Sequence, residues 1–169
     1  MKKILLLNPP APRLCVRDYY CGFSSKAEYC WPPQDLVVLS GILSGDLQVC
    51  YLDPCSAGYD RRRSLEYILA GDCDAVIFTS GSLHLTEDIA FVKEIKDNRA
   101  RAKIIGSSAV FRFIGADIMR EHPFIDGLLR DFTNNDAVLF LSGEYENIAD
   151  MFFRDRNRAL RSNWKEREY

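Results

Sequence analysis

The stretch that decides the fold runs from residue 74 to residue 90, Asp74-Ala-Val-Ile-Phe-Thr-Ser-Gly-Ser-Leu-His-Leu-Thr-Glu-Asp-Ile-Ala90. It begins with the apolar, β-branched run 75–78, which has the length and composition of a buried strand. Small polar residues follow, and after Thr86 the apolar residues recur with helical spacing. Glu87 and Asp88 lie in the first turn of this segment, where they suit the helix dipole. Together these features predict half of a βαβ unit, whose loop at the carboxyl end of the strand is a usual place for a ligand.

The same alternation continues along the chain. Apolar runs that predict strands cover residues 3–7, 48–53, 75–78, 103–105 and 124–129. Helical periodicity covers residues 34–43, 62–70, 113–121 and 135–141, in addition to the segment after Thr86. This order predicts an α/β fold with a doubly wound, parallel, five-stranded sheet in the flavodoxin-like order 2-1-3-4-5.

The pattern weakens beyond Gly143. Residues 149–153 and 158–161 indicate two short strands around a turn. We therefore expect one α/β domain over residues 1–142, followed over residues 143–169 by a linker that leads toward a missing C-terminal domain. Residues 13–33 are rich in aromatic residues and cysteine, and we expect them to form a long functional or docking loop.

Composition narrows the class of protein. The chain has 169 residues, 47% of them hydrophobic, with a formal net charge of -2. This charge disfavours a nucleic-acid partner or an anionic membrane, both of which need a basic surface. The amino-terminal apolar run 4–7 is too short for a signal peptide, so we expect a cytoplasmic protein. We expect the six cysteines to be reduced, because the sequence shows no export signal. No pair has the Cys-x-x-Cys spacing, which disfavours a zinc or thioredoxin-like site.

In a parallel sheet of this order, the loops after the first, third, fourth and fifth strands line one crevice. They contain small residues and hydroxyls, which let a ligand approach the backbone and form hydrogen bonds. Tight turns use the same residues for steric reasons alone, so this composition leaves both interpretations open. The candidate ligand-binding residues in these loops are Asn8, Pro9, Pro10, Ser80, Gly81, Ser82, His84, Gly106, Ser107, Ser108 and Thr133.

Several familiar chemistries are disfavoured. No Gly-x-Gly-x-x-Gly follows the first strand, and no Gly-x-x-x-x-Gly-Lys-[Ser/Thr] occurs, so neither a dinucleotide nor a phosphate loop is indicated. Asn8 and Thr79 stand at strand ends where a receiver domain needs acidic residues. His84 fits a base or a metal ligand, but a single loop histidine also fits a polar surface residue. The sequence thus gives no convincing set of catalytic residues.

Five segments, in order, resemble one known family: Lys3-Ile-Leu-Leu-Leu-Asn-Pro-Pro10, Trp31-Pro-Pro-Gln-Asp-Leu36, Val49-Cys-Tyr-Leu-Asp53, Asp74-Ala-Val-Ile-Phe-Thr-Ser80 and Ile104-Ile-Gly106. Together they are similar to the N-terminal cobalamin-binding domain of B12-dependent radical SAM enzymes. The likeness covers roughly residues 1–135, and the segment after Gly143 resembles the bridge to the radical SAM barrel.

The resemblance implies a Rossmann-like cobalamin-binding fold, with the corrin across the carboxyl ends of the strands. It places the loop 8–10, with His84 and Thr133, near the corrin. It implies that Ser80 and Ser82 hydrogen-bond the nucleotide tail or the corrin amides. It also implies that Gly106 and Ser107 stand where the family has a Gly-Gly pair against the tail.

Three departures from the family pattern matter. The chain lacks Asp-x-His-x-x-Gly after the first strand, Ser107 replaces the second glycine, and no Cys-x3-Cys-x2-Cys occurs. A [4Fe-4S] cluster and S-adenosylmethionine would therefore belong to a missing or partner radical SAM domain, in cis or in trans. Our favoured hypothesis is a cobalamin-binding domain that is not catalytic alone. The alternatives are a cofactor-free, flavodoxin-like interaction module that docks through residues 13–33, and a small enzyme that uses His84 or Cys15.

Overall fold

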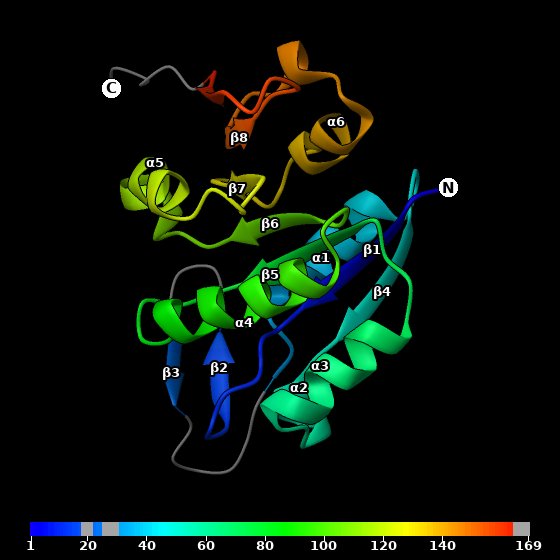
Figure 1. The fold of residues 1–169 in the computed structure, drawn as a ribbon, viewed down its shortest axis with the longest axis vertical. Coiled ribbons are helices and arrows are strands. Elements are labelled where there is room, and N and C mark those ends of the chain that lie inside the picture. The colour runs from blue at the N-terminus through cyan, green and yellow to red at the C-terminus, as the bar shows by residue number, and fades with distance from the viewer. Residues whose placement is uncertain (18–21, 25–30, 164–169) are drawn as a thin grey trace.

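The computed structural model describes residues 1–17, 22–24 and 31–163, which build an α/β fold around a mostly parallel sheet (Figure 1). Seven strands form this sheet in the order β4-β1-β5-β6-β7-β8-β9. Neighbours from β4 to β7 are parallel, whereas β8 and β9 are antiparallel to their neighbours. The strands are β1 (Lys3–Leu7), β4 (Gln48–Leu52), β5 (Ala75–Thr79), β6 (Lys103–Ser107), β7 (Gly127–Leu129), β8 (Met151–Arg154) and β9 (Leu160–Ser162).

The α/β class and the mostly parallel sheet are confirmed, but the prediction of five strands in the order 2-1-3-4-5 is wrong in strand number and in the full strand order. The two short strands expected after Gly143 do form, and they join the sheet beyond β7. Met151 and Phe153 of β8 are buried in the core, and the Met151 side chain fills the space beside Gly127, which has no Cβ. The extension therefore covers an apolar strand that would otherwise be exposed.

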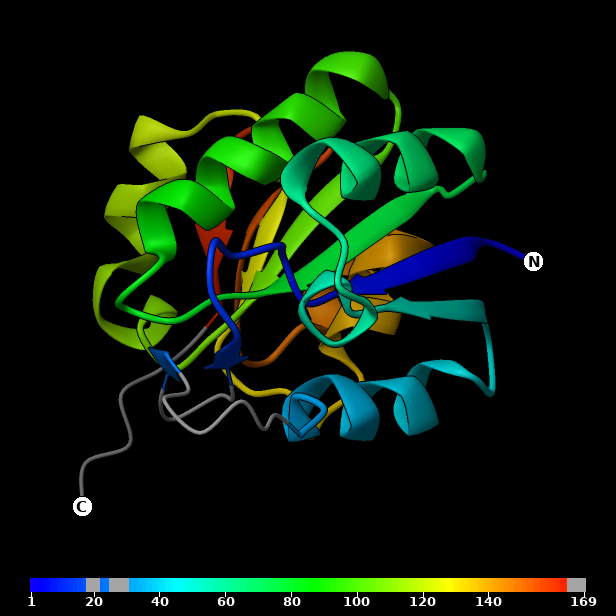
Figure 2. The same cartoon turned by 90° about the horizontal axis from the view of Figure 1, so that it is seen from below.

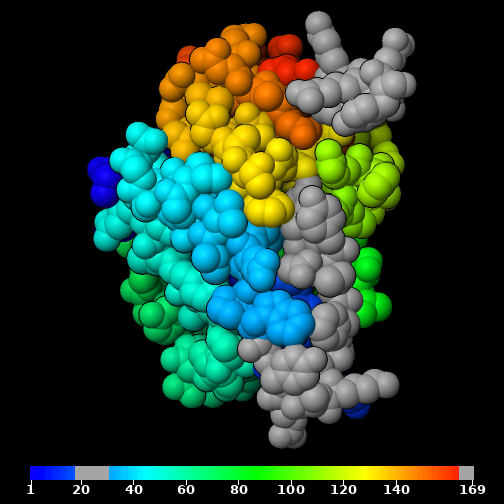
Figure 3. All heavy atoms as spheres, turned by 180° about the vertical axis from the view of Figure 1, so that it is seen from behind, coloured from blue at the N-terminus to red at the C-terminus, as the bar shows by residue number. Residues whose placement is uncertain are grey.

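Helices cover both faces of the sheet, as Figure 2 shows from below. The core cluster on one face includes side chains of α1 and α6, and the cluster on the other face includes side chains of α3, α4 and α5. In Figure 3, α1 forms much of the surface seen from behind, next to the C-terminal elements in yellow and orange. The helices are α1 (Gln34–Leu43), α2 (Pro54–Ala57), α3 (Arg61–Ala70), α4 (Leu85–Asn98), α5 (Phe111–Glu121) and α6 (Asp136–Ser142), and the 3-10 helix η1 covers Tyr145–Asn147.

Burial on both faces explains the uninterrupted apolar runs. Along β1, Ile4 and Leu6 belong to one core cluster, and Leu5 and Leu7 belong to the other. All five residues of β5 are buried. Full burial of one such aliphatic side chain stabilises the fold by about 1.5–3 kcal/mol.

Two segments hold local structure that the predicted strands and helices do not include. Residues 54–57 form the short helix α2, at whose start the Asp53 carboxylate accepts a hydrogen bond from the Ser56 amide. Gly58 ends this helix with φ 66°, a left-handed conformation that glycine adopts without steric strain. Within the predicted loop 13–33, β2 (Cys15–Arg17) and β3 (Gly22–Ser24) form an antiparallel hairpin. Residues 18–21 and 25–30, with Tyr19, Tyr20 and Tyr29 of the proposed docking face, lie outside the described residues.

A buried carboxylate just before β7 joins α4, β6 and the turn between β8 and β9, near the amino ends of the parallel strands. Asp126 accepts a hydrogen bond from the Ile104 amide at 3.0 Å, and it pairs with Lys96, Lys103 and Arg158. Burial raises the pKa of this carboxyl, but the Ile104 amide and the three cations outweigh that effect and hold the pKa below its ordinary value. Asp126 is therefore ionised in the folded protein at neutral pH.

No helix within the described residues is both long and apolar enough to cross a bilayer.

Candidate ligand site at the carboxyl edge of the sheet

The carboxyl ends of β1, β5, β6 and β7 meet at one edge of the sheet. The predicted binding residues lie in the loops that follow these strands, except Gly106 and Ser107, which are the last two residues of β6. In a parallel sheet this edge is where ligands bind, because the loops and the amino-terminal ends of the following helices converge there. In Figure 1 the hairpin of β2 and β3 lies on the side of the molecule where the arrowhead of β1 ends.

Arg17, the last residue of β2, is buried at this edge with 1% of its surface exposed. Its guanidinium forms two hydrogen bonds with the Asp88 carboxylate, from Nε at 3.1 Å and from Nη2 at 2.8 Å. Nη1 donates to Asn8 Oδ1 at 3.0 Å and to the Pro9 carbonyl at 2.8 Å. One arginine therefore ties the hairpin to β1 and to α4.

Asp88 lies in the first turn of α4 and is fully buried. Besides Arg17, it accepts a hydrogen bond from Ser80 Oγ at 2.8 Å. Burial raises the pKa of the Asp88 carboxyl to about 6, although Arg17 and Ser80 act in the opposite direction. Asp88 in turn raises the pKa of the Arg17 guanidinium, despite the opposing effect of burial. At neutral pH the two groups form a buried ion pair.

The network continues from Asn8 to the loop after β4. Asn8 Nδ2 donates to Asp53 Oδ1 at 2.9 Å, and Asp53 also accepts hydrogen bonds from the Ser56 amide at 3.2 Å and the Tyr51 hydroxyl at 3.3 Å. The Asn8 side chain therefore uses its oxygen and one of its amide hydrogens in hydrogen bonds within the protein. Asn8 serves the fold at this edge, whatever else it contacts.

The structure brings three of the predicted residues, Asn8, Pro9 and Ser80, into the Arg17 network. Gly81 and Ser108 are buried, whereas Ser82 and Thr133 are exposed. Pro10 is partly buried. No contact in the structure tests whether any of these residues binds a ligand, so their roles stay predictions.

Ser107, the last residue of β6, holds a hydroxyl that the fold does not use. It lies between Thr79 of β5 and Leu129 of β7 and is fully buried. Its neighbour Thr79 donates a hydrogen bond to Asp35 Oδ2 at 3.1 Å. Ser107 Oγ, in contrast, has no hydrogen-bond partner within the described part of the chain. A buried hydroxyl without a protein partner is uncommon in native proteins, and this one is available to pair with a ligand at the edge.

His84 presents a second such atom. It precedes α4 at the N-cap position, and its ring is partly buried. Its Nε2 atom is buried and has no hydrogen-bond partner among residues 1–17, 22–24 and 31–163. Burial, and then the nearby positive charge of Arg17, lowers the pKa of this imidazole. The ring is therefore neutral at pH 7.

Gly106 is surrounded by side chains of the protein itself. A Cβ at this position would lie 2.7 Å from Phe111 Cε2 and 2.8 Å from Leu128 Cδ2. The packing of α5 on the sheet thus already requires glycine here. The proposed packing of Gly106 against a nucleotide tail remains a prediction, which this close contact neither supports nor excludes.

Exposed apolar side chains stand where helices begin at this edge. Leu83 precedes α4 and is 61% exposed, and Phe113 in the first turn of α5 is 85% exposed. Ile114 beside it is also exposed. Exposure of this kind is common for single residues but suits contact with an apolar ligand or partner when several gather at one edge.

The sequence interpretation missed the Arg17–Asp88 pair. A signal was present, because Asp88 shares its helical face with Leu85, Ile89 and Val92, of which Ile89 and Val92 are buried. A carboxylate on an apolar stripe requires a buried partner. The sequence does not identify this partner, because Arg17 is one of several arginines. Arg17 contacts Asp88 only because the β2–β3 hairpin places it beside α4.

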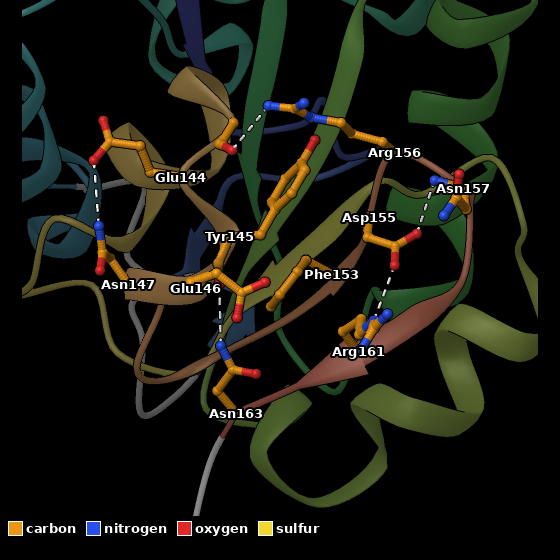
Figure 4. A pocket seen from close by; sticks show the side chains of 11 residues that line it. Glu144, Tyr145, Glu146, Asn147, Phe153, Asp155, Arg156, Asn157, Arg161 and Asn163 are labelled. Carbon is orange, nitrogen blue, oxygen red and sulfur yellow. Dashed lines mark hydrogen bonds and ion pairs between the residues drawn. The ribbon is translucent and has the colours of Figure 1, made fainter.

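A second hollow lies away from this edge, between η1 and the β8–β9 hairpin (Figure 4). Its volume is about 480 Å³, and Tyr145, stacked on Phe153, forms part of its wall. Asp155 pairs with Arg161 at 2.9 Å, and Asn163 donates to the Tyr145 carbonyl at 3.1 Å. None of the predicted binding residues lines this hollow.

Comparisons with known proteins show likeness in structure alone. No protein-family model matches the chain, and no curated protein matches it. Among solved structures, the chain is similar to the apo, selenomethionine-labelled form of a cobalamin-dependent S-adenosylmethionine radical enzyme, OxsB, with a TM-score of 0.71 and 13% sequence identity. The match covers 98% of this chain and 22% of the OxsB chain. The two proteins therefore share a fold over nearly all of this chain, which spans about a fifth of the length of that enzyme.

Proposed function

We propose that the chain is a cobalamin-binding domain, not catalytic by itself, which presents the corrin to a radical SAM domain in cis or in trans. The fold that it shares with part of a cobalamin-dependent enzyme supports this proposal. When bound, cobalamin would supply methyl-transfer or cobalt redox chemistry. The chain contains no Cys-x3-Cys-x2-Cys, so the [4Fe-4S] cluster and S-adenosylmethionine would bind to the radical SAM domain.

The observation that carries the proposal is the unused hydroxyl of Ser107 at the carboxyl end of β6. A buried polar group without a partner destabilises a protein by about 1–3 kcal/mol, and a ligand that supplies a hydrogen bond removes this penalty. Cobalamin carries amides, a phosphate and a ribose, all of which can pair with a hydroxyl. The residues at this edge therefore fit the polar periphery of the cofactor.

The apolar residues at the same edge fit the other part of a corrin, its hydrocarbon periphery. Leu83, Phe113 and Ile114 are exposed where α4 and α5 begin. Large cofactors are held mainly by apolar surface, with a few polar groups that fix their orientation. The Arg17 network occupies the part of the edge near β1 and β4 and also uses Ser80 after β5, which leaves chiefly the ends of β6 and β7 and the loops after them for a ligand.

Two further parts of the proposal concern the partners of the protein and its cellular compartment. The net charge of -2 supports neither a nucleic-acid partner nor an anionic membrane. We also infer that the protein is cytoplasmic.

The test is direct retention of the cofactor. The purified protein is incubated with hydroxocobalamin, passed through gel filtration, and its visible spectrum is recorded in the protein peak. A retained corrin spectrum that weakens in Ser107→Ala but not in the matched control Ser40→Ala supports the proposal. Ser40 is a suitable control because its hydroxyl already donates to the Val37 carbonyl at 2.7 Å in α1. A colourless peak with several cobalamin forms would contradict the proposal and favour a cofactor-free interaction module, for which the exposed Phe113 is a candidate contact.

A further inference from the structure

The hollow between η1 and the β8–β9 hairpin is a cavity that the proposed function does not use (Figure 4). Its volume of about 480 Å³ falls within the range of small-molecule sites. Asn163 ties the two walls together, because its side-chain amide donates to the carbonyls of Tyr145 at 3.1 Å and Ile148 at 2.9 Å. The ring of Tyr145 also stacks on Phe153, with 5.5 Å between the centroids. The cavity is therefore shaped by contacts of the protein itself.

The two walls of this hollow carry opposite charges. Glu144 and Glu146 lie on the side of η1, whereas Arg156 and Arg161 lie on the side of the hairpin. A fifth charged residue, Asp155, accepts a hydrogen bond from Arg161 Nε at 2.9 Å and two more from backbone amides of its own turn. The charge of Asp155 is therefore used to hold the hairpin and Arg161 in place.

Three of these charged groups keep hydrogen-bonding capacity for a ligand. The Glu146 carboxylate is exposed and forms no hydrogen bond or ion pair within residues 1–17, 22–24 and 31–163. Arg161 uses only Nε for Asp155. Arg156 reaches the Gly143 carbonyl only at 3.5 Å, beyond the usual length of a hydrogen bond. A carboxylate on one wall and two guanidinium groups on the other are therefore available.

The charges of the walls select one class of ligand. A metal ion is disfavoured, because the described part of the chain contains no group of three or more His, Cys, Asp or Glu side chains that could hold one. A phosphate or another simple anion would lie beside three carboxylates, and a simple organic cation would lie beside two guanidinium groups. A zwitterion avoids both repulsions, because each of its charges can face the wall of opposite sign.

We propose that this hollow binds a free α-amino acid with an apolar or aromatic side chain. Its carboxylate pairs with Arg156 and Arg161, since a planar guanidinium matches a carboxylate in shape and charge. Its ammonium pairs with Glu146, and its side chain rests against the ring of Tyr145. The site is separate from the carboxyl edge of the sheet, and it does not depend on the proposed binding of cobalamin.

The experiment titrates the full nitrogen-15-labelled chain with three probes and follows its backbone amides by two-dimensional nuclear magnetic resonance. L-phenylalanine carries both charges, N-acetyl-L-phenylalanine lacks the ammonium, and L-phenylalaninamide lacks the carboxylate. A slightly acidic buffer keeps all the remaining charges in place. We expect L-phenylalanine to shift the amides of residues 143–147 and 155–163 in a saturable way. Each analogue should bind about tenfold more weakly, because it loses one charge-assisted contact.

Two variants test the two walls separately. Glu146→Gln should bind L-phenylalanine about tenfold more weakly and should bind N-acetyl-L-phenylalanine as the unmodified protein does, because that probe has no ammonium. Arg156→Gln should weaken the binding of L-phenylalanine and leave that of L-phenylalaninamide unchanged. The matched controls are Glu66→Gln and Arg62→Gln, which alter an exposed ion pair on α3 and should change none of the affinities.

Each alternative outcome would overturn the proposal. Equal affinities for the three probes would show contact through the aromatic ring alone. Shifts that rise linearly with concentration, or that fall on amides outside the hollow, would show that no amino-acid site exists there. If Glu146→Gln weakens the binding of L-phenylalanine and N-acetyl-L-phenylalanine equally, the carboxylate does not hold the ammonium. The three probes on the unmodified protein decide the question even if a variant folds poorly, and none of these results bears on the retention of cobalamin.

Discussion

Replacement of Ser107 by alanine should raise the stability of the free protein and lower its affinity for cobalamin. The Ser107 hydroxyl is fully buried and has no partner in the described chain, so its removal relieves the desolvation penalty of about 1–3 kcal/mol that such a group imposes. The Cβ stays in place, and only one oxygen atom is lost from the packing. We therefore expect the free energy of unfolding to rise by about 1 kcal/mol. The lost hydrogen bond to the cofactor, worth about 1.4 kcal/mol, should weaken binding roughly tenfold.

Ser80→Ala is the matched comparison, because Ser80 is equally buried but donates to the Asp88 carboxylate at 2.8 Å. A hydrogen bond to a charged group stabilises by about 1.5–3 kcal/mol, so this variant should lose about 2 kcal/mol. Urea unfolding at pH 7, followed by far-ultraviolet circular dichroism, measures both changes in the absence of cofactor. If Ser107→Ala loses as much stability as Ser80→Ala, its hydroxyl has a partner in the free protein. The argument from an unused polar group would then be refuted.

Three further changes test other parts of the structure. Arg17→Met leaves a buried carboxylate unpaired, so urea unfolding should show a loss of about 3–5 kcal/mol, and a change below 1 kcal/mol would show that the pair is not formed. Gly106→Val forces a side chain against Phe111 and should lower stability by about 1–3 kcal/mol, whereas Gly41→Ala, in open space on α1, should be neutral or stabilising; equal thermal midpoints would contradict the packing described here. The pKa of Asp126 is lower in the folded than in the unfolded state, so acid protonates the unfolded chain first and stability falls as the pH drops toward about 4 and below. Asp126→Asn should flatten that part of the stability profile, and an unchanged acid limb in urea titrations at several pH values would show that the cations around Asp126 contribute nothing.

The parallel part of the sheet could be predicted because strands that are buried on both faces have continuous apolar sequences. The runs 3–7 and 75–78 have no polar interruption, and the structure places them in β1 and β5, where side chains of both directions enter a core. The antiparallel extension was readable only in part. The apolar run Met151-Phe-Phe153 indicates a short strand in the sequence but does not say which edge of the sheet the strand joins.

The position of the candidate edge could be predicted from the topology of the sheet. The hydrogen bonding of the residues at this edge could not. Ser80 and Ser107 look alike in the sequence, since both follow or end an apolar strand in a run of small residues. In the structure one hydroxyl pairs with Asp88 and the other pairs with nothing among the described residues. The difference arises because Asp88, eight residues after Ser80, turns its carboxylate back over the strand end, and a side-chain direction of this kind follows from helix packing.

The place of β1 in the sheet has a consequence for the order of events during protein synthesis. β1 is made first, and its two neighbours follow later: β4 ends at residue 52 and β5 ends at residue 79. One edge of the apolar run Ile4-Leu5-Leu6-Leu7 therefore stays unpaired until residue 79 has left the ribosome, and a segment of this kind associates with other chains when its partners are late. α1 can cover only the face of β1 that carries Ile4 and Leu6, because the helices that pack against Leu5 and Leu7 follow later in the chain. We therefore expect the nascent chain to be prone to association with other chains over roughly its first half.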